Sequence, residues 1–199
     1  MIEGLNIIQK SFKEKKVHFR GKYYKIKNFI CNPKPLKNIP IWLGEADNKL
    51  MVREIVKNAD VFNSMPCSLN VLKKKLDVIK RECKKQKKNF VNIGKSLETQ
   101  ILIAKNDRDL EKKIMNIKKK KKINKTFDND IISRLNQLNK KNIDYSDIKT
   151  LKNEFFIGTI DEIKKKIQEF SKIGVNHFMF WPMDFPDNYT LKKLINKIV

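Results

Sequence analysis

Residues 39–63, IPIWLGEADNKLMVREIVKNADVFN, decide the fold that we predict for this chain. The short apolar run Ile39–Leu43 is typical of a buried parallel strand. From Asn48 onward, apolar side chains recur at intervals of three and four, which predicts a helix with one face on a sheet. The chain then returns as a second extended run, Val61–Asn63. The stretch therefore predicts a strand–helix–strand repeat of an α/β fold.

The loop of this repeat, Gly44-Glu45-Ala46-Asp47-Asn48, is the first candidate site. Asp47 is placed to cap the helix that follows. A loop that leaves a parallel strand and opens a helix presents backbone N–H groups and a partial positive charge, which suit a phosphate. Every α/β unit makes such a turn, so local pattern leaves both a phosphate site and a plain connection open.

Length and composition favour one large domain over residues 1–199, since no obvious linker divides the chain. There is no apolar run of about 18 residues and no signal-peptide core, so we expect a cytoplasmic protein without a membrane partner. The three cysteines, Cys31, Cys67 and Cys83, are odd in number and widely spaced. They favour reduced thiols over a disulfide framework or a metal site.

The chain carries 45 lysines and arginines against 22 acidic residues, for a formal net charge of +23. A field of this size attracts nucleic acid or an anionic membrane surface non-specifically. The lysines are nevertheless scattered over predicted helix faces, and Asn and Ile are also abundant, as compositional drift produces. Drift accounts for the charge better than a nucleic-acid partner does. The run Lys118–Lys122 is either a solvated helix end or a local anion patch.

Four strand–helix units are predicted in all, with strands near Ile39, Val61, Ser96 and Val175. Alternation of strands and helices predicts a parallel sheet with right-handed crossovers.

Three further segments flank or interrupt these units. A helix is expected over Ile2–Phe12, and a β-hairpin over Val17–Phe29 with Gly21 at its turn. The polar segment 118–153 is expected to be an insertion, either a lid over a site or a poorly ordered excursion. Thr159 and Glu162 form a capping box that predicts the start of another helix.

Few side chains stand out as candidates for chemistry. His177 alternates with apolar neighbours, so a core histidine is the simpler interpretation and a site role the alternative. His18 is expected at the surface of the hairpin, and Cys83 in the core. Trp181 and Asp184 lie where the last strand meets its loop, the position at which α/β barrels keep their chemistry.

None of the common nucleotide, hydrolase or metal motifs occurs, so the order of segments carries the functional signal. That order resembles the C-terminal half of the luciferase-like monooxygenase superfamily, most closely its deazaflavin-using branch. The segments are FRGKYY (19–24), CNPKP (31–35), PIWLGEA (40–46), NADVFN (58–63) and FFIGTIDEIKKKIQEFSKIGVNHFMFW (155–181). They cover nearly the whole chain apart from the polar insertion.

The resemblance implies a partial (β/α)8 TIM barrel, in which the Ile39 strand is the fifth and the Val175 strand the eighth. It also implies that a flavin-type cofactor, coenzyme F420 or FMN, lies at the carboxyl ends of the strands. Its phosphate would lie near the loop after the fifth strand. The cofactor-binding positions carried over are Gly44, Glu45, Ala46 and Asn48.

Two features depart from the family pattern. The carboxylate of Glu45 would repel a phosphate unless it points away and only its N–H is used. A full barrel takes about 250 residues, and the strands expected before the Ile39 strand are absent, so we predict a truncated or split form.

The resemblance implies an oxidoreductase that acts on a small organic substrate. Two alternatives stay open: a non-catalytic partner that completes a barrel with another chain or in a homodimer, and a basic nucleic-acid-binding protein. The sequence identifies no catalytic residue.

Overall fold

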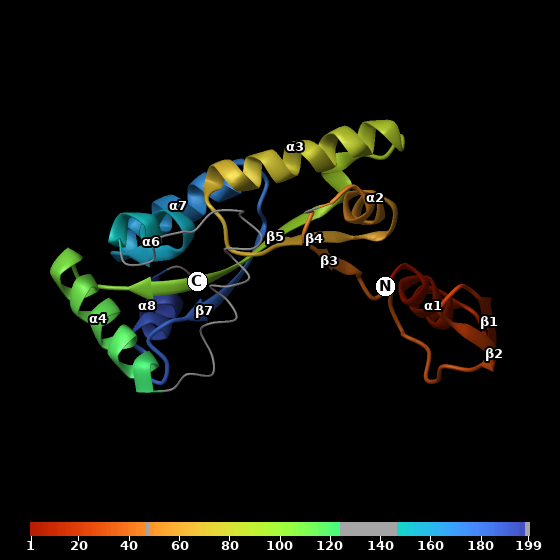
Figure 1. Ribbon diagram of the computed structural model, residues 1–199, viewed down its shortest axis with the longest axis horizontal. Helices are drawn as coiled ribbons and strands as arrows, with labels where there is room; N and C mark the ends of the chain where they lie inside the picture. Colours follow the sequence, from red (N-terminus) through yellow and green to blue (C-terminus); the bar gives the residue numbers. More distant parts are fainter. Residues whose placement is uncertain (47, 124–146, 198–199) are drawn as a thin grey trace. The chain divides into compact units, whose positions relative to one another are not determined.

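The computed structural model describes residues 1–46, 48–123 and 147–197 of the chain. The chain divides into two units, Met1–Ile41 and Trp42–Val199 (Figure 1). The single domain predicted over residues 1–199 stays a prediction.

The first unit is a helix followed by a β-hairpin. Helix α1 (Ile2–Lys13) precedes strands β1 (Val17–Arg20) and β2 (Lys25–Phe29), and the two strands pair antiparallel. The predicted helix and hairpin are both confirmed.

The turn of the hairpin is held by a carboxylate from α1. Glu3 accepts hydrogen bonds from the backbone N–H groups of Lys22 at 2.7 Å, Tyr23 at 2.9 Å and Tyr24 at 3.0 Å. Gly21 closes the turn, its N–H donating to the carbonyl of Tyr24 at 2.8 Å. The donors of an exposed turn are thus satisfied within the unit.

The second unit is built on five strands, all parallel: β3 (Trp42–Gly44), β4 (Val61–Ser64), β5 (Gly94–Ile103), β6 (Phe156–Gly158) and β7 (His177–Pro182). The order begins β3-β4-β5, and β5 then pairs with both β6 and β7. Ile101 pairs with Phe156 and with Pro182, so β6 and β7 lie on opposite edges of β5. The parallel α/β sheet of the prediction is confirmed.

Two details of the strand prediction were wrong. The chain has a fifth strand, β6, where four were predicted, because three residues beside a capping box are too short to show a period of two. The first strand begins at Trp42 rather than Ile39. Pro40 has no N–H to donate to a ladder, which agrees with the later start.

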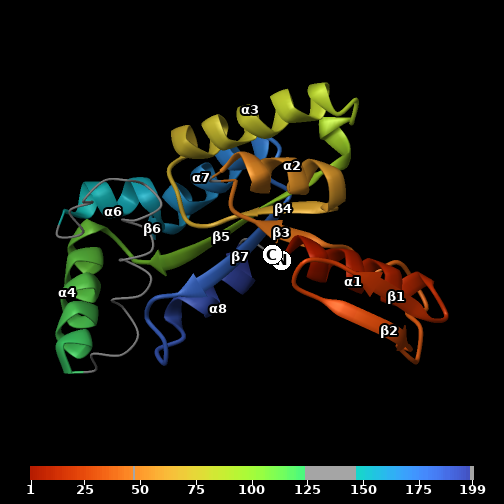
Figure 2. The ribbon, with the colours of Figure 1, turned by 45° about the vertical axis from the view of Figure 1, so that its right-hand side comes forward.

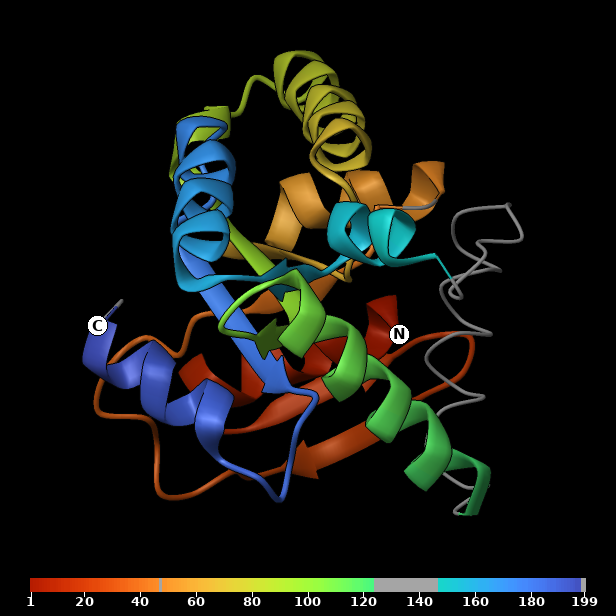
Figure 3. The ribbon, with the colours of Figure 1, turned by 90° about the vertical axis from the view of Figure 1, so that its left-hand side faces the viewer.

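Helices α2 (Lys49–Asn58), α3 (Leu69–Lys85) and α7 (Ile160–Lys172) lie over one face of the strands (Figure 2). With the carboxyl end of β5 toward the viewer, these helices form an arc around the sheet (Figure 3). The remaining helices are η1 (Phe90–Asn92), α4 (Asp107–Ile123), α6 (Ile148–Glu154) and α8 (Tyr189–Lys197). Among the helices that the structure describes, none is long and apolar enough to cross a membrane.

The main core fills the space between this arc and the sheet. Its largest fully buried side chains include Phe62, Leu97, Ile101, Phe156 and Phe170. Each contributes about 1.5–3 kcal/mol on burial. A second, smaller cluster joins the carboxyl ends of β5 and β6 to α4 and α6; it includes Leu102, Leu110, Ile114, Leu151 and Ile157.

The predicted insertion 118–153 lies partly outside the described residues. Its first residues continue α4 and its last ones form α6, whereas residues 124–146 lie outside the described part of the chain. The backbone of Lys118–Lys122 therefore belongs to a helix end.

The sheet is strongly curved, and its face away from the helices is concave. Trp42 in β3 and His177 in β7 are three strands apart, yet their ring centroids lie 4.9 Å from each other in an edge-to-face contact. A flat sheet would separate them by about 14 Å at the usual strand spacing. The curvature is that of part of a barrel wall, which agrees with the partial (β/α)8 barrel predicted.

Candidate functional site

The predicted cofactor loop leaves the sheet at the end of β3. Gly44 is the last residue of that strand, and Trp181 is the second-to-last residue of β7. Because all five strands are parallel, the loops after both strands leave from the carboxyl edge of the sheet. Both loops therefore lie at the rim where the resemblance places the cofactor.

Glu45 turns its carboxylate away from the loop. Its φ is +50°, in the left-handed region, and its side chain reaches the loop after β4. There Oε1 accepts the N–H of Met65 at 2.7 Å, and Oε2 forms an ion pair with Lys75 Nζ at 2.8 Å. The repulsion expected between this carboxylate and a phosphate is therefore offset by a cation.

The N–H of Glu45 is also engaged. It donates to the carbonyl of Asn63 at 3.3 Å. The idea that Glu45 would offer only its N–H to a phosphate thus requires that bond to open, and the remaining donors must come from the residues that follow.

Asn48 is the N-cap of α2. Its Oδ1 accepts the N–H of Met51 at 2.9 Å, as capping side chains do. Asp47, the predicted cap, lies outside the described residues. Ala46 is half-buried against the core, whereas Asn48 and Lys49 are exposed. Lys49, which the sequence argument missed, adds a cation at the mouth of the loop.

A polar row on the concave face was also missed. The ladder registers align Gly44, Asn63, Ser96 and His177 across β3, β4, β5 and β7. Asn63 Oδ1 and Ser96 Oγ are buried there without a hydrogen-bond partner, as is Gln100 Oε1 farther along β5. The sequence carried only part of this signal, since Ser96, Glu98 and Gln100 occupy alternate positions but Lys95 and Thr99 beside them are also polar.

His177 is not the core histidine that was predicted. Its side chain is exposed, with its ring against that of Trp42. The apolar neighbours Phe178 and Phe180 pack toward the helices, which leaves the alternate positions of β7 on the concave face. His18 is exposed and Cys83 is buried, as predicted.

The candidates at the end of β7 have separate partners. Trp181 is 58% exposed, and its Nε1 donates to Glu98 Oε1 at 3.0 Å. Asp184 is buried; its Oδ2 accepts the N–H of Thr190 at 3.0 Å at the start of α8, and its Oδ1 has no partner.

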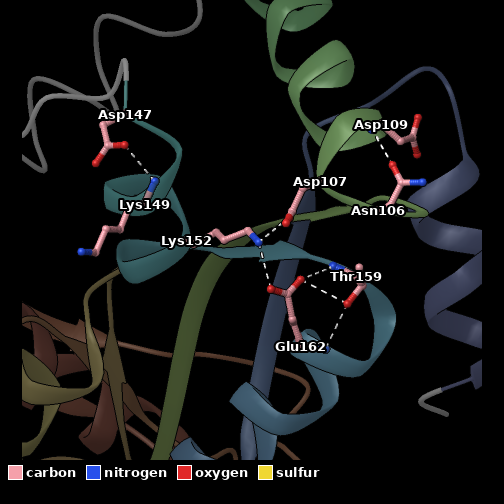
Figure 4. A network of polar contacts seen from close by, with 8 residues as sticks. All are labelled: Asn106, Asp107, Asp109, Asp147, Lys149, Lys152, Thr159 and Glu162. Carbon is pink, nitrogen blue, oxygen red and sulfur yellow. Dashed lines mark hydrogen bonds and ion pairs between the residues drawn. The ribbon is translucent and has the colours of Figure 1, made fainter.

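A polar network fastens the helices beside the carboxyl ends of β5 and β6 (Figure 4). Lys152 Nζ donates to Asp107 Oδ1 at 2.8 Å and to Glu162 Oε1 at 2.9 Å, and these hydrogen bonds raise the pKa of Lys152. Glu162 also accepts the N–H of Thr159 at 2.7 Å in the predicted capping box. The network joins α4, α6 and α7.

A cavity of about 280 Å³ lies beside this network, and its lining includes Lys152, Glu162, Lys166 and Phe170. Lys166 Nζ donates to the carbonyls of Lys152, Asn153 and Phe155 at 2.6–2.9 Å. Burial lowers the pKa of Lys166 to about 8. Lys166 thus caps the carboxyl end of α6. The residues that line the cavity include none of the predicted cofactor-binding positions. Within the described part of the chain, no cluster of His, Cys, Asp or Glu could hold a metal ion.

Comparison with known proteins gives one family and a consistent fold. The family model described as luciferase-like monooxygenase matches residues 1–177. No protein of curated function matches the chain.

Solved structures match nearly all of the chain. An F420-dependent secondary alcohol dehydrogenase in complex with an F420-acetone adduct is 15% identical, with a TM-score of 0.72; the match covers 98% of this chain and 59% of that one. The coenzyme F420-dependent tetrahydromethanopterin reductase from Methanopyrus kandleri is 17% identical, with a TM-score of 0.69 and coverage of 97% and 60%.

A third structure contains FMN. It is the oxygenating constituent of 3,6-diketocamphane monooxygenase, a type II Baeyer-Villiger monooxygenase from Pseudomonas putida, 18% identical with a TM-score of 0.71; the match covers 98% of this chain and 60% of that one. The chain therefore spans about three-fifths of the length of the structures that it matches.

Proposed function

Because the chain belongs to the luciferase-like monooxygenase family, we propose that it is part of an oxidoreductase that uses coenzyme F420 or FMN on a small organic substrate. The observation that carries this proposal is the loop after β3. It opens α2 at the carboxyl edge of a parallel sheet, and the carboxylate of Glu45 in this loop is paired to Lys75.

The cofactor phosphate is assigned to Gly44, Glu45, Ala46 and Asn48. Lys75 holds the Glu45 carboxylate toward the loop after β4, and Lys49 is exposed beside the N-cap. The positive end of α2 then faces an anion with no opposing free carboxylate among the described loop residues.

The cofactor supplies the hydride chemistry when it is bound. This chain would bind the phosphate at one rim, orient the ring by its curved sheet and exclude water with the barrel wall. The described ladders leave one edge of β3 and one edge of β7 without a strand partner. We assign to these edges the further strands that close the barrel, whether from the same chain or another.

The test is a titration with FMN and with coenzyme F420, followed by their own fluorescence, on the chain alone and together with a barrel-completing segment. Asn48→Asp keeps a capping side chain but adds a negative charge at the loop. We expect it to weaken FMN binding about tenfold, or about 1.4 kcal/mol, and to leave riboflavin, which has no phosphate, unaffected.

The matched control is Asn89→Asp, which adds the same charge at the N-cap of η1, before β5. Since η1 precedes a strand, it lies at the opposite end of the ladder from the loop after β3. Equal losses in the two variants would remove the assignment of the phosphate to this loop. No cofactor binding even with the barrel completed would remove the oxidoreductase assignment.

The unpartnered edges of β3 and β7 favour one second candidate, a non-catalytic barrel-completing subunit. Sedimentation distinguishes it: this role predicts an obligate oligomer that binds neither cofactor, whereas the oxidoreductase binds one of them.

A further inference from the structure

We propose that the concave face of the sheet binds an uncharged organic molecule through its hydroxyl groups and discriminates against anions. We call this the inner face; it consists of Trp42, Asn63, Ser96, Glu98, Gln100, His177, Met179 and Trp181. The inference rests on the proposed function, because it names the class of substrate that the oxidoreductase would take.

Unsatisfied hydrogen-bonding atoms carry the first step. Ser96 is 1% exposed, and its Oγ has no partner; the same holds for the buried atoms Asn63 Oδ1 and Gln100 Oε1. A buried polar atom without a partner destabilises the folded state. Three of them on one face, two in directly paired residues, form a site that a hydroxyl-bearing molecule satisfies.

Charge carries the second step. Lysine and arginine make up 45 of 199 residues, yet none is among the inner-face residues defined above. Lys95 shows how the face is kept free of cations: it precedes Ser96, points to the other side and donates to the carbonyl of Phe90 at 2.9 Å. Glu98 is the one aspartate or glutamate among the inner-face residues, and its carboxylate accepts the Nε1–H of Trp181. An anion would meet acceptors and a carboxylate.

Aromatic surface carries the third step. Both tryptophans of the chain, Trp42 and Trp181, belong to the inner face and are 39% and 58% exposed. Their rings suit the apolar part of an organic molecule. Intrinsic tryptophan fluorescence therefore reports on this face alone.

The experiment titrates the full chain, without cofactor, with cyclohexanol and with cyclohexanecarboxylate while tryptophan fluorescence is recorded. We expect a saturable change with the alcohol and binding at least tenfold weaker with the carboxylate. Equal binding of the two probes, or no saturable change with the alcohol, overturns the proposal.

Ser96→Ala separates a binding role from a structural one. Loss of one hydrogen bond should weaken alcohol binding about 2- to 10-fold. The melting temperature without ligand should stay equal or rise, because the variant removes an unsatisfied buried hydroxyl. Ser171→Ala, at an exposed position of α7, is the control and should change neither quantity. A lower melting temperature with unchanged alcohol binding shows a structural hydroxyl and overturns the proposal.

Failure of the proposed function gives a different result. Cofactor binding is followed by FMN or F420 fluorescence, and alcohol binding by tryptophan fluorescence without cofactor. Loss of the first with retention of the second refutes the oxidoreductase but not the inner-face site, and the reverse result refutes only the inner-face site.

Discussion

The ion pair between Glu45 and Lys75 fixes the position of the candidate cofactor loop, and its removal should be measurable. The two charged atoms lie 2.8 Å apart, and the side chains are 16% and 17% exposed. Exposed pairs contribute about 0–1 kcal/mol, whereas breaking a buried pair costs about 3–5 kcal/mol. Glu45 keeps its bond from the Met65 N–H, so we expect Lys75→Met to cost about 2 kcal/mol.

For a chain of this size, that loss lowers the melting temperature by roughly 4–8 °C. Thermal and urea unfolding followed by circular dichroism measure it. Lys74→Met removes the same charge at an exposed position one residue earlier in α3 and should change stability by less than about 0.5 kcal/mol.

A double-mutant cycle with Glu45→Gln isolates the pair from other effects of each substitution. We expect a coupling energy of about 1–2 kcal/mol between Glu45 and Lys75. Additive effects, or equal stability of the Lys75→Met and Lys74→Met proteins, would refute the argument that this pair holds the loop.

Two further predictions concern the lysines around α6. Burial lowers the pKa of Lys166 to about 8 in the folded chain, so between pH 8 and the ordinary lysine pKa the unfolded chain binds more protons and stability rises with pH. From pH 7 to pH 10 the wild type should therefore gain unfolding free energy relative to Lys166→Met. Relative to Lys165→Met it should show no such gain. Lys152→Met should lower the unfolding free energy by about 1 kcal/mol, and by less in 1 M salt because salt screens exposed ion pairs. Lys149→Met on the same helix is the control. A loss that does not depend on salt would contradict the electrostatic account.

Local pattern predicted the elements that have a strong period. The repeat 39–63, the hairpin and the capping box at Thr159 were all readable, because each depends on residues close together in the sequence. Strand β6 was not readable, because three residues show no period. The exposure of His177 was also missed: which face of β7 is covered depends on helices remote in sequence.

The candidate site was readable only in part for the same reason. Gly44 to Asn48 follow from a strand–helix boundary, but the partner of the Glu45 carboxylate lies thirty residues away on α3. The polar positions Ser96, Glu98 and Gln100 showed their alternation in the sequence. Which of these side chains finds a partner depends on the tertiary structure: Glu98 accepts from Trp181, whereas Ser96 Oγ and Gln100 Oε1 have no partner.

Asn63 connects the two sites that we propose. Its carbonyl accepts the N–H of Glu45 at 3.3 Å, at the cofactor loop, and its side-chain Oδ1 lies unpartnered beside Ser96 on the inner face. A phosphate that recruited the Glu45 N–H would have to break the bond to the Asn63 carbonyl. Loss of that bond would free the backbone of Asn63 to move. Because Asn63 also carries the inner-face oxygen Oδ1, that oxygen would move with it. Occupation of the loop and hydrogen bonding on the inner face should therefore be coupled through one residue, in both directions.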